Sequence, residues 1–172
     1  MKDIHARSIT DAIAALAVRA CCKLPRGVRR SFETALHREP SPVGRNILGQ
    51  LLENAAIAAE ENIPICQDTG LAVVFADLGQ DVHIVGGDFE DAVNEGVRRG
   101  YVDGCLRKSC VAEPLFERRN TRDNTPAVIH TRIVPGDSLR LRLAPKGAGS
   151  ENKSVLKMLT PADGIAGVRG VV

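Results

Sequence analysis

The densest group of reactive side chains lies on four consecutive residues, Cys66, Gln67, Asp68 and Thr69. Pro64 precedes this group and Gly70 ends it, which is typical of a turn. A thiol, an amide, a carboxylate and a hydroxyl in one turn are costly to bury unless they bind something. The pattern therefore predicts a thiolate metal ligand with acid–base and hydrogen-bonding groups beside it. In the alternative interpretation, the aspartate caps backbone N–H groups and the cysteine packs inward.

A second group is rich in glycine and includes Lys146, Gly147 and Gly149. Glycine lets the backbone approach a ligand closely, and free N–H groups at the start of a helix favour an anion. The segment is not a P-loop, because the Gly-Lys-Ser/Thr end of that motif is missing. It is not a dinucleotide-binding fingerprint, because Asn152 stands where the third glycine would be. It predicts a turn that binds a carboxylate or phosphate, or else a tight strand-to-helix turn without a ligand.

Arg107 and Lys108 form a basic pair. An arginine can grip a carboxylate with its forked guanidinium, although many such pairs are only solvated. His130 lies within a predicted strand and is interpreted as a structural histidine. Cys105 and Cys110 share a spacing with one iron–sulfur motif but lack the rest of that motif.

Composition narrows the classes of protein to which the chain can belong. It has 172 residues, 44% of them hydrophobic, a net charge of +2 and five cysteines. An odd number of cysteines in a chain of this size argues against a secreted disulfide framework and favours the cytoplasm. Aromatic residues make up 3% of the chain, so a base-stacking surface for nucleic acid is excluded. The longest apolar run, residues 12–18, is far shorter than the roughly 20 residues of a membrane span.

Hydrophobic periodicity indicates which elements position these residues. Apolar residues three or four apart predict helices near residues 9–20, 28–36 and 41–61. After Pro64, apolar stretches predict short strands at 71–75, 82–84, 127–134 and 139–143, with a helix that Asp88 begins. A final helix is predicted to open at Ser150 and to carry Val155, Leu156 and Leu159. The fold class predicted is α+β in one domain over 1–172: a helical part (1–62), then a mixed, partly antiparallel sheet with flanking helices (63–172).

Five segments in this order resemble the class I, iron–sulfur fumarate hydratases and the related two-subunit tartrate dehydratases. They are residues 63–70 (IPICQDTG), 94–101 (NEGVRRGY), 106–109 (LRKS), 120–130 (NTRDNTPAVIH) and 146–154 (KGAGSENKS). The resemblance covers nearly all of the chain and corresponds to the N-terminal part of the α subunit.

The resemblance implies a [4Fe–4S] cluster held by three cysteines, with an open iron that acts as a Lewis acid on the substrate hydroxyl. It implies Cys66 as one cluster ligand and Asp68 as the residue that transfers a proton. It also implies a set of substrate-binding residues: Gln67, Arg107, Gly149 and Lys146.

The family's other cluster cysteines lie further along the α region, one of them in a Cys-Pro-Pro segment that this sequence lacks. The other four cysteines, Cys105 and Cys110 included, are therefore predicted to be packing residues. The resemblance implies partners: the remaining α region, a β subunit or β region, and further αβ units in a homo-oligomer. The chain alone is expected to be inactive.

The implied reaction is the hydration of fumarate, a dicarboxylate, to malate. Dehydration of L(+)-tartrate and a non-catalytic scaffold of the same fold are the alternatives. A zinc–thiolate domain is disfavoured because the sequence has no Cys-x-x-Cys pair.

Overall fold

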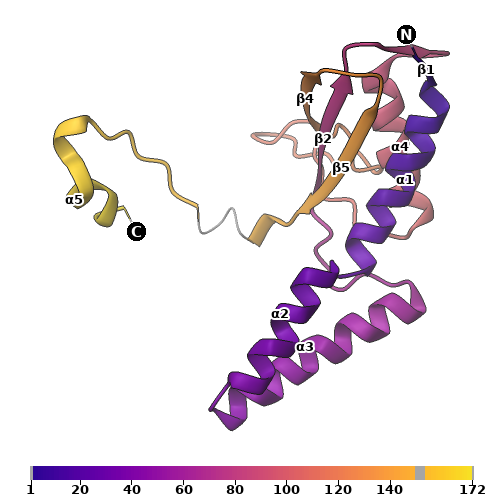
Figure 1. The fold of residues 1–172 in the computed structure, drawn as a ribbon. Coiled ribbons are helices and arrows are strands. Elements are labelled where there is room, and N and C mark those ends of the chain that lie inside the picture. The colour runs from indigo at the N-terminus through magenta and orange to yellow at the C-terminus, as the bar shows by residue number, and fades with distance from the viewer. Residues whose placement is uncertain (1, 150–153, 172) are drawn as a thin grey trace.

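The computed structural model describes residues 2–149 and 154–171. A three-stranded sheet in the order β4-β2-β5 forms its centre (Figure 1). The central strand β2 (Leu71–Gly79) pairs parallel with β4 (Val128–Val134) and antiparallel with β5 (Leu139–Lys146). A second, two-stranded sheet joins β1 (Lys2–His5) in parallel with β3 (Val82–Val85). With its helical first part and mixed sheet, the structure confirms the predicted α+β class.

Two helices, α1 (Ala6–Cys22) and α4 (Phe89–Asp103), pack on one face of the three-stranded sheet. The core between them holds the largest buried side chains, among them Ile9, Ile13, Val74, Val97 and Tyr101. Asp88 begins α4 as predicted, since its carboxylate accepts the N–H groups of Glu90 and Asp91 at 2.7 and 3.0 Å. The second glycine of α4 sits against α1: a Cβ on Gly100 would lie 2.8 Å from the Ala17 Cβ.

Helices α2 (Arg26–Arg38) and α3 (Pro42–Glu61) form a hairpin that projects from the sheet (Figure 1). Ser41 begins α3 as predicted, because its hydroxyl accepts the Gly44 N–H at 3.4 Å. Asn62 ends it in the left-handed conformation, with φ 54°.

The predicted final helix is wrong. Ser150 lies outside the described residues, but residues 154–160 are irregular, with Val155 67% and Leu156 92% exposed. A short amphipathic segment is not stable as a helix without an apolar surface to pack on, and these side chains find none. A 3-10 turn, η2 (Pro161–Asp163), and a short helix, α5 (Gly164–Arg169), follow instead.

Cysteine burial follows the prediction at three of the four positions interpreted as packing. Cys21, Cys22 and Cys110 are buried. Cys105 is exposed, so its interpretation as a packing residue is wrong. It lies just beyond the end of α4 with φ 52°, a backbone conformation that turns its side chain out of the core.

Candidate functional site

The sheet register brings two of the three predicted groups together. Strand β2 begins at Leu71, directly after the CQDTG loop (residues 66–70), and β5 ends at Lys146, directly before Gly147. Leu71 and Lys146 are partners in the antiparallel register. The CQDTG loop and the glycine turn (Lys146, Gly147, Ala148 and Gly149) therefore meet at one edge of the sheet.

Asp68 joins the loop to the turn. Its Oδ1 accepts the N–H of Gly70 at 3.1 Å and its Oδ2 accepts the N–H of Ala148 at 2.9 Å. Gly70 has φ +63°, and a Cβ there would lie 2.2 Å from the carbonyl oxygen of Lys146, so only glycine fits this crossing. The capping role that was an alternative for this aspartate is thus present in the structure.

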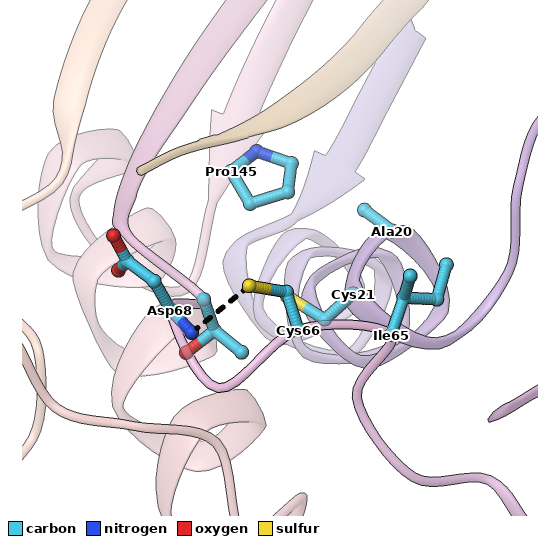
Figure 2. A pocket seen from close by; sticks show the side chains of 7 residues that line it. Ala20, Cys21, Ile65, Cys66, Asp68 and Pro145 are labelled. Atoms are coloured by element: carbon cyan, nitrogen blue, oxygen red, sulfur yellow. Dashed lines mark hydrogen bonds between the residues drawn. The ribbon is translucent and has the colours of Figure 1, made fainter. Parts of the chain in front are cut away.

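Cys66 is exposed and does not pack inward. Its Sγ accepts the Asp68 N–H at 3.5 Å and donates to the Gln67 side-chain oxygen at 3.5 Å. The thiol lines a shallow pocket of about 150 Å³ with Cys21, Thr69 and Pro145 among its walls. Figure 2 shows the Cys66 side chain between Asp68 and Cys21, with the Asp68 carboxylate pointing away from the sulfur.

Tyr101, the single tyrosine of the chain, lies under the CQDTG loop on the core side and hydrogen-bonds to it. It is fully buried on α4, and its hydroxyl lies 3.0 Å from the Thr69 carbonyl oxygen and 3.3 Å from that of Gly70. Burial raises the pKa of this phenol, so the hydroxyl keeps its proton and remains a donor. The Thr69 hydroxyl in turn donates to the Arg107 carbonyl oxygen at 3.0 Å, which ties the third predicted group to the loop.

Asn124 makes a second link between the loop and the basic segment. It is fully buried in the left-handed conformation, with φ 65°. Its amide N–H donates to the Gly70 carbonyl oxygen at 3.0 Å, and its oxygen accepts the N–H groups of Ser109 and Cys110 at 2.7 and 3.3 Å. Sequence reasoning assigned no role to Tyr101 or Asn124, although both lie inside the segments that carry the resemblance.

The predicted substrate-binding side chains have different surroundings. Gln67 is an exposed residue of the loop itself. Arg107 is also exposed, and its carbonyl oxygen accepts the Thr69 hydroxyl of the loop. The Lys146 ammonium donates to the Gly147 carbonyl oxygen at 3.2 Å. Gly149 is exposed, and a Cβ there would meet no atom within 4 Å.

His130 does not belong to this site. It is exposed in the middle of β4, where it stacks on Phe75 with ring centroids 5.2 Å apart. The prediction of a structural histidine is consistent with this stacked position.

The two thiols that line the pocket, Cys21 and Cys66, differ in burial. Burial, followed by the neighbouring Cys22, raises the pKa of Cys21 to about 11, so this thiol stays protonated at neutral pH. Cys66 is the exposed thiol of the pocket and is accessible to a metal. Within residues 2–149 and 154–171, no group of three His, Cys, Asp or Glu side chains is arranged to hold a metal ion.

Comparison with known proteins agrees with the resemblance. The model of the fumarate hydratase (Fumerase) family matches residues 10–172. The chain belongs to the fumarate hydratase family.

Named relatives of this fumarate hydratase homologue include both kinds of hydro-lyase. The chain is 35% identical over 177 residues to the "Putative L(+)-tartrate dehydratase subunit alpha" of Methanocaldococcus jannaschii. This alignment covers 95% of the chain and 59% of that relative. The chain is 38% identical over 125 residues to the anaerobic class I fumarate hydratase of Escherichia coli K12, covering 72% of this chain and 23% of that enzyme. It is 26% identical over 164 residues to the L(+)-tartrate dehydratase subunit alpha of Escherichia coli UTI89, covering 93% of this chain and 53% of the relative. The chain thus spans less than two thirds of each of these proteins.

None of the helices in the described parts of the chain is both long enough and apolar enough to cross a membrane.

Proposed function

We propose that this chain is the N-terminal part of the α subunit of an iron–sulfur hydro-lyase that hydrates fumarate to malate. One observation carries the proposal: an exposed thiol and an oriented carboxylate lie two residues apart on the CQDTG loop, which three separate elements hold in place. Asp68 fastens this loop to the glycine turn, Tyr101 supports it from α4, and Asn124 ties it to residues 109–110.

Cys66 is the proposed cluster ligand. An exposed cysteine is chemically suited to this role, because iron–sulfur clusters are held by cysteine thiolates. We assign the remaining ligands to the rest of the α region, outside the residues that the structure describes. When bound, a [4Fe–4S] cluster with an open iron would supply Lewis-acid chemistry at the substrate hydroxyl.

Asp68 is the proposed proton-transfer residue. Two backbone N–H groups fix its carboxylate, at 3.1 and 2.9 Å, so its orientation is set before substrate arrives. Gln67 is its exposed neighbour and is placed to hydrogen-bond the substrate.

Two further groups are proposed to bind the substrate carboxylates. The exposed guanidinium of Arg107 can form a forked, charge-assisted pair with a carboxylate. Gly149 would offer a backbone N–H from the glycine turn, which Lys146 helps to frame.

L(+)-tartrate is the second candidate substrate, and a specific observation favours it. The alignment with the relative named as a tartrate dehydratase subunit covers 95% of this chain. The alignment with the fumarate hydratase of Escherichia coli K12 covers 72% of it. Both substrates are four-carbon dicarboxylates that gain or lose water, so the residues described above serve either reaction.

The proposed partners are the remaining α region and a β subunit or region, because two relatives are named as alpha subunits. We also propose that these αβ units form a homo-oligomer and work in the cytoplasm, where the five free cysteines would remain reduced.

The test is to assemble the chain with these partners without oxygen, add iron and sulfide, and assay fumarate, malate and both tartrate enantiomers. Cys66→Ser is expected to lower the iron and sulfide content of the complex and abolish activity. Cys105→Ser, at a similarly exposed cysteine, is the matched control and should change neither. Full activity in the Cys66 variant would refute the ligand assignment, and activity on tartrate alone would select the second substrate.

A further inference from the structure

A second cavity adjoins the CQDTG loop and the glycine turn, and we call it the Ser109 cavity after one residue of its wall. Its volume is about 390 Å³, whereas the pocket beside Cys66 has about 150 Å³. Sites that hold a whole small molecule usually measure about 300–1,000 Å³, so the Ser109 cavity is large enough for one. Gly70 and Ala148 also line it, and their N–H groups are the two that hold Asp68.

The Ser109 cavity and the pocket beside Cys66 lie on opposite faces of the β2–β5 pair. Leu71 and Lys146, which are partners in the register, line the cavity. Pro145, the neighbour of Lys146 in β5, lines the pocket beside Cys66 instead. Successive residues of a strand point to opposite faces of the sheet. The cavity is therefore next to the candidate site but separate from the pocket that contains the exposed thiol.

The Ser109 hydroxyl is a polar group that lacks a hydrogen bond. Its oxygen is buried and has no partner among the residues that the structure describes. The backbone at this position is fixed, because the Ser109 N–H donates to the Asn124 side-chain oxygen at 2.7 Å. A buried polar group without a partner is costly, and rotation about χ1 moves the hydroxyl without moving the backbone. Because Ser109 lines the cavity, a ligand bound there can supply the missing partner.

Lys146 gives the cavity a positive charge. It is the one charged residue among the described residues of the cavity wall. The Cys110 thiol, also in the wall, adds no negative charge at neutral pH, because burial raises its pKa. An ammonium group and a hydroxyl both donate hydrogen bonds, and together they match the oxygens of one carboxylate.

Much of the remaining wall is apolar. Leu71, Val111, Pro114 and Pro126 present hydrocarbon surface to the cavity. A second carboxylate placed against these side chains would lose its hydration without gaining a partner. The wall therefore suits a ligand with one carboxylate and a short hydrocarbon chain.

We propose that the Ser109 cavity binds a short aliphatic monocarboxylate. The carboxylate accepts hydrogen bonds from the Lys146 ammonium and the rotated Ser109 hydroxyl, and the hydrocarbon chain packs against Leu71 and the two prolines. The ligand class differs from the dicarboxylate substrates, so this proposal does not depend on the proposed function.

The test is the binding of butyrate to the isotope-labelled 172-residue chain, followed through the backbone amide signals in NMR. We expect saturable shifts at Ser109, Val111 and Ala148, which lie in the cavity wall. The affinity should fall with added salt, because the carboxylate pairs with an ammonium group. Succinate should bind at least about tenfold more weakly than butyrate, because its second carboxylate would face the apolar wall. Inorganic phosphate should also bind more weakly than butyrate, because it has no hydrocarbon chain to pack there.

Two variants change the proposed contacts. Ser109→Ala should weaken butyrate binding about tenfold through the loss of one hydrogen bond to a charged group. It should not lower the free energy of unfolding of the ligand-free chain, because the hydroxyl has no partner there among the described residues. Lys146→Met removes the charge at similar length and should weaken binding at least about tenfold.

Cys66→Ser and Ser31→Ala are the controls. Ser31 lies on α2, far along the chain from the cavity, and its hydroxyl donates to the Gly27 carbonyl oxygen. Both variants should bind butyrate like the wild type. Cys66→Ser is also the variant expected to abolish activity of the assembled complex, so a failure of one proposal can be told apart from a failure of the other.

Several results would overturn the proposal. These are the absence of saturable shifts at the cavity residues, an unchanged affinity in Ser109→Ala, a loss of butyrate binding in Cys66→Ser, or tighter binding of succinate or phosphate than of butyrate. A Ser109→Ala chain that is less stable without ligand would assign the hydroxyl a structural role and contradict the one proposed.

Discussion

At the scale of single residues, one carboxylate connects the two segments of the candidate site. Asp68 accepts one N–H from its own loop and one from the glycine turn, 80 residues further along the chain. The same side chain is the proposed proton-transfer residue. A substitution that keeps one of the two hydrogen bonds but removes the carboxylate can separate its structural role from its chemical role.

Replacing Asp68 with Asn tests that separation. The amide oxygen can keep the bond from Gly70, but its NH₂ group cannot accept the Ala148 N–H. We expect a loss of about 1 kcal/mol in the free energy of unfolding, measured by urea denaturation. In the assembled enzyme we expect kcat/KM to fall by at least about 100-fold.

Asp137→Asn, in the exposed β4–β5 turn, is the matched control and should leave both quantities unchanged. An Asp68→Asn enzyme with wild-type kcat/KM would rule out the proton-transfer role.

Buried thiols make stability fall at alkaline pH. The pKa of Cys21 is about 11 in the folded chain because of burial and Cys22, against an ordinary value near 9. Between these values the unfolded chain loses the thiol proton and the folded chain keeps it, so the free energy of unfolding decreases as pH rises. The contribution of Cys21 that is lost between about pH 9 and pH 11 is up to about 3 kcal/mol.

Urea denaturation at pH 8, 9, 10 and 11 measures this loss. Cys21→Ala should show a shallower decline than the wild type, with a remainder from the raised pKa values of Tyr101 and Cys110. A decline of equal steepness in both proteins would exclude the buried thiol as its source.

At the scale of elements, the contact between α1 and α4 depends on glycine. A Cβ on Gly96 would lie 2.7 Å from the Thr10 carbonyl oxygen and 2.7 Å from the Ile13 Cβ. We expect Gly96→Ala to lower the free energy of unfolding by about 2 kcal/mol, because α1 and α4 would have to move apart.

Gly49, inside α3, provides the comparison. A Cβ there meets nothing within 4 Å, so Gly49→Ala should raise stability by about 0.5–1 kcal/mol through helix propensity. Calorimetry on both variants decides, and a stable Gly96→Ala protein would show that the two helices do not need this close approach.

Elements with local signals were predictable from the sequence. Ser41 and Asp88 begin their helices, and Asn62 ends one, because each effect depends on neighbouring residues. Strand β5 runs three residues beyond its predicted end, through Pro145 to Lys146. As an edge strand, β5 tolerates a proline that a central strand would not.

Long-range contacts account for what could not be predicted. Strand β1 has only four residues, and the residues of β3 with which it pairs lie 80 positions later in the chain. The CQDTG loop was predicted as a candidate site from its residue types, but the roles of Tyr101 and Asn124 depend on bonds to residues 31–54 positions away. The apolar periodicity at 155–159 predicts a helix, but Val155 and Leu156 find no surface on which to pack and are 67% and 92% exposed.

At the scale of the whole molecule, the proposed function makes the chain one part of a larger catalytic site. It spans 59% of the tartrate dehydratase relative from Methanocaldococcus jannaschii, and its described residues contain no set of three metal ligands. We expect the isolated 172-residue chain to show no hydration of fumarate after anaerobic incubation with iron and sulfide, and activity to appear when the proposed partners are added. Turnover by the isolated chain at the rate of the assembled complex would contradict this proposal.

The mixed pairing of β2 also sets the order in which the molecule can form. The α2–α3 hairpin joins neighbours in the sequence, whereas β2 pairs with a strand 55 residues later at Val128 and with another that ends at Lys146. Closing such long loops is slow compared with forming local helices. Pulse-labelled hydrogen exchange should therefore protect α3 before β5. The candidate site lies where β2 starts and β5 ends, so we expect it to be assembled late in folding and to be lost early when the sheet opens.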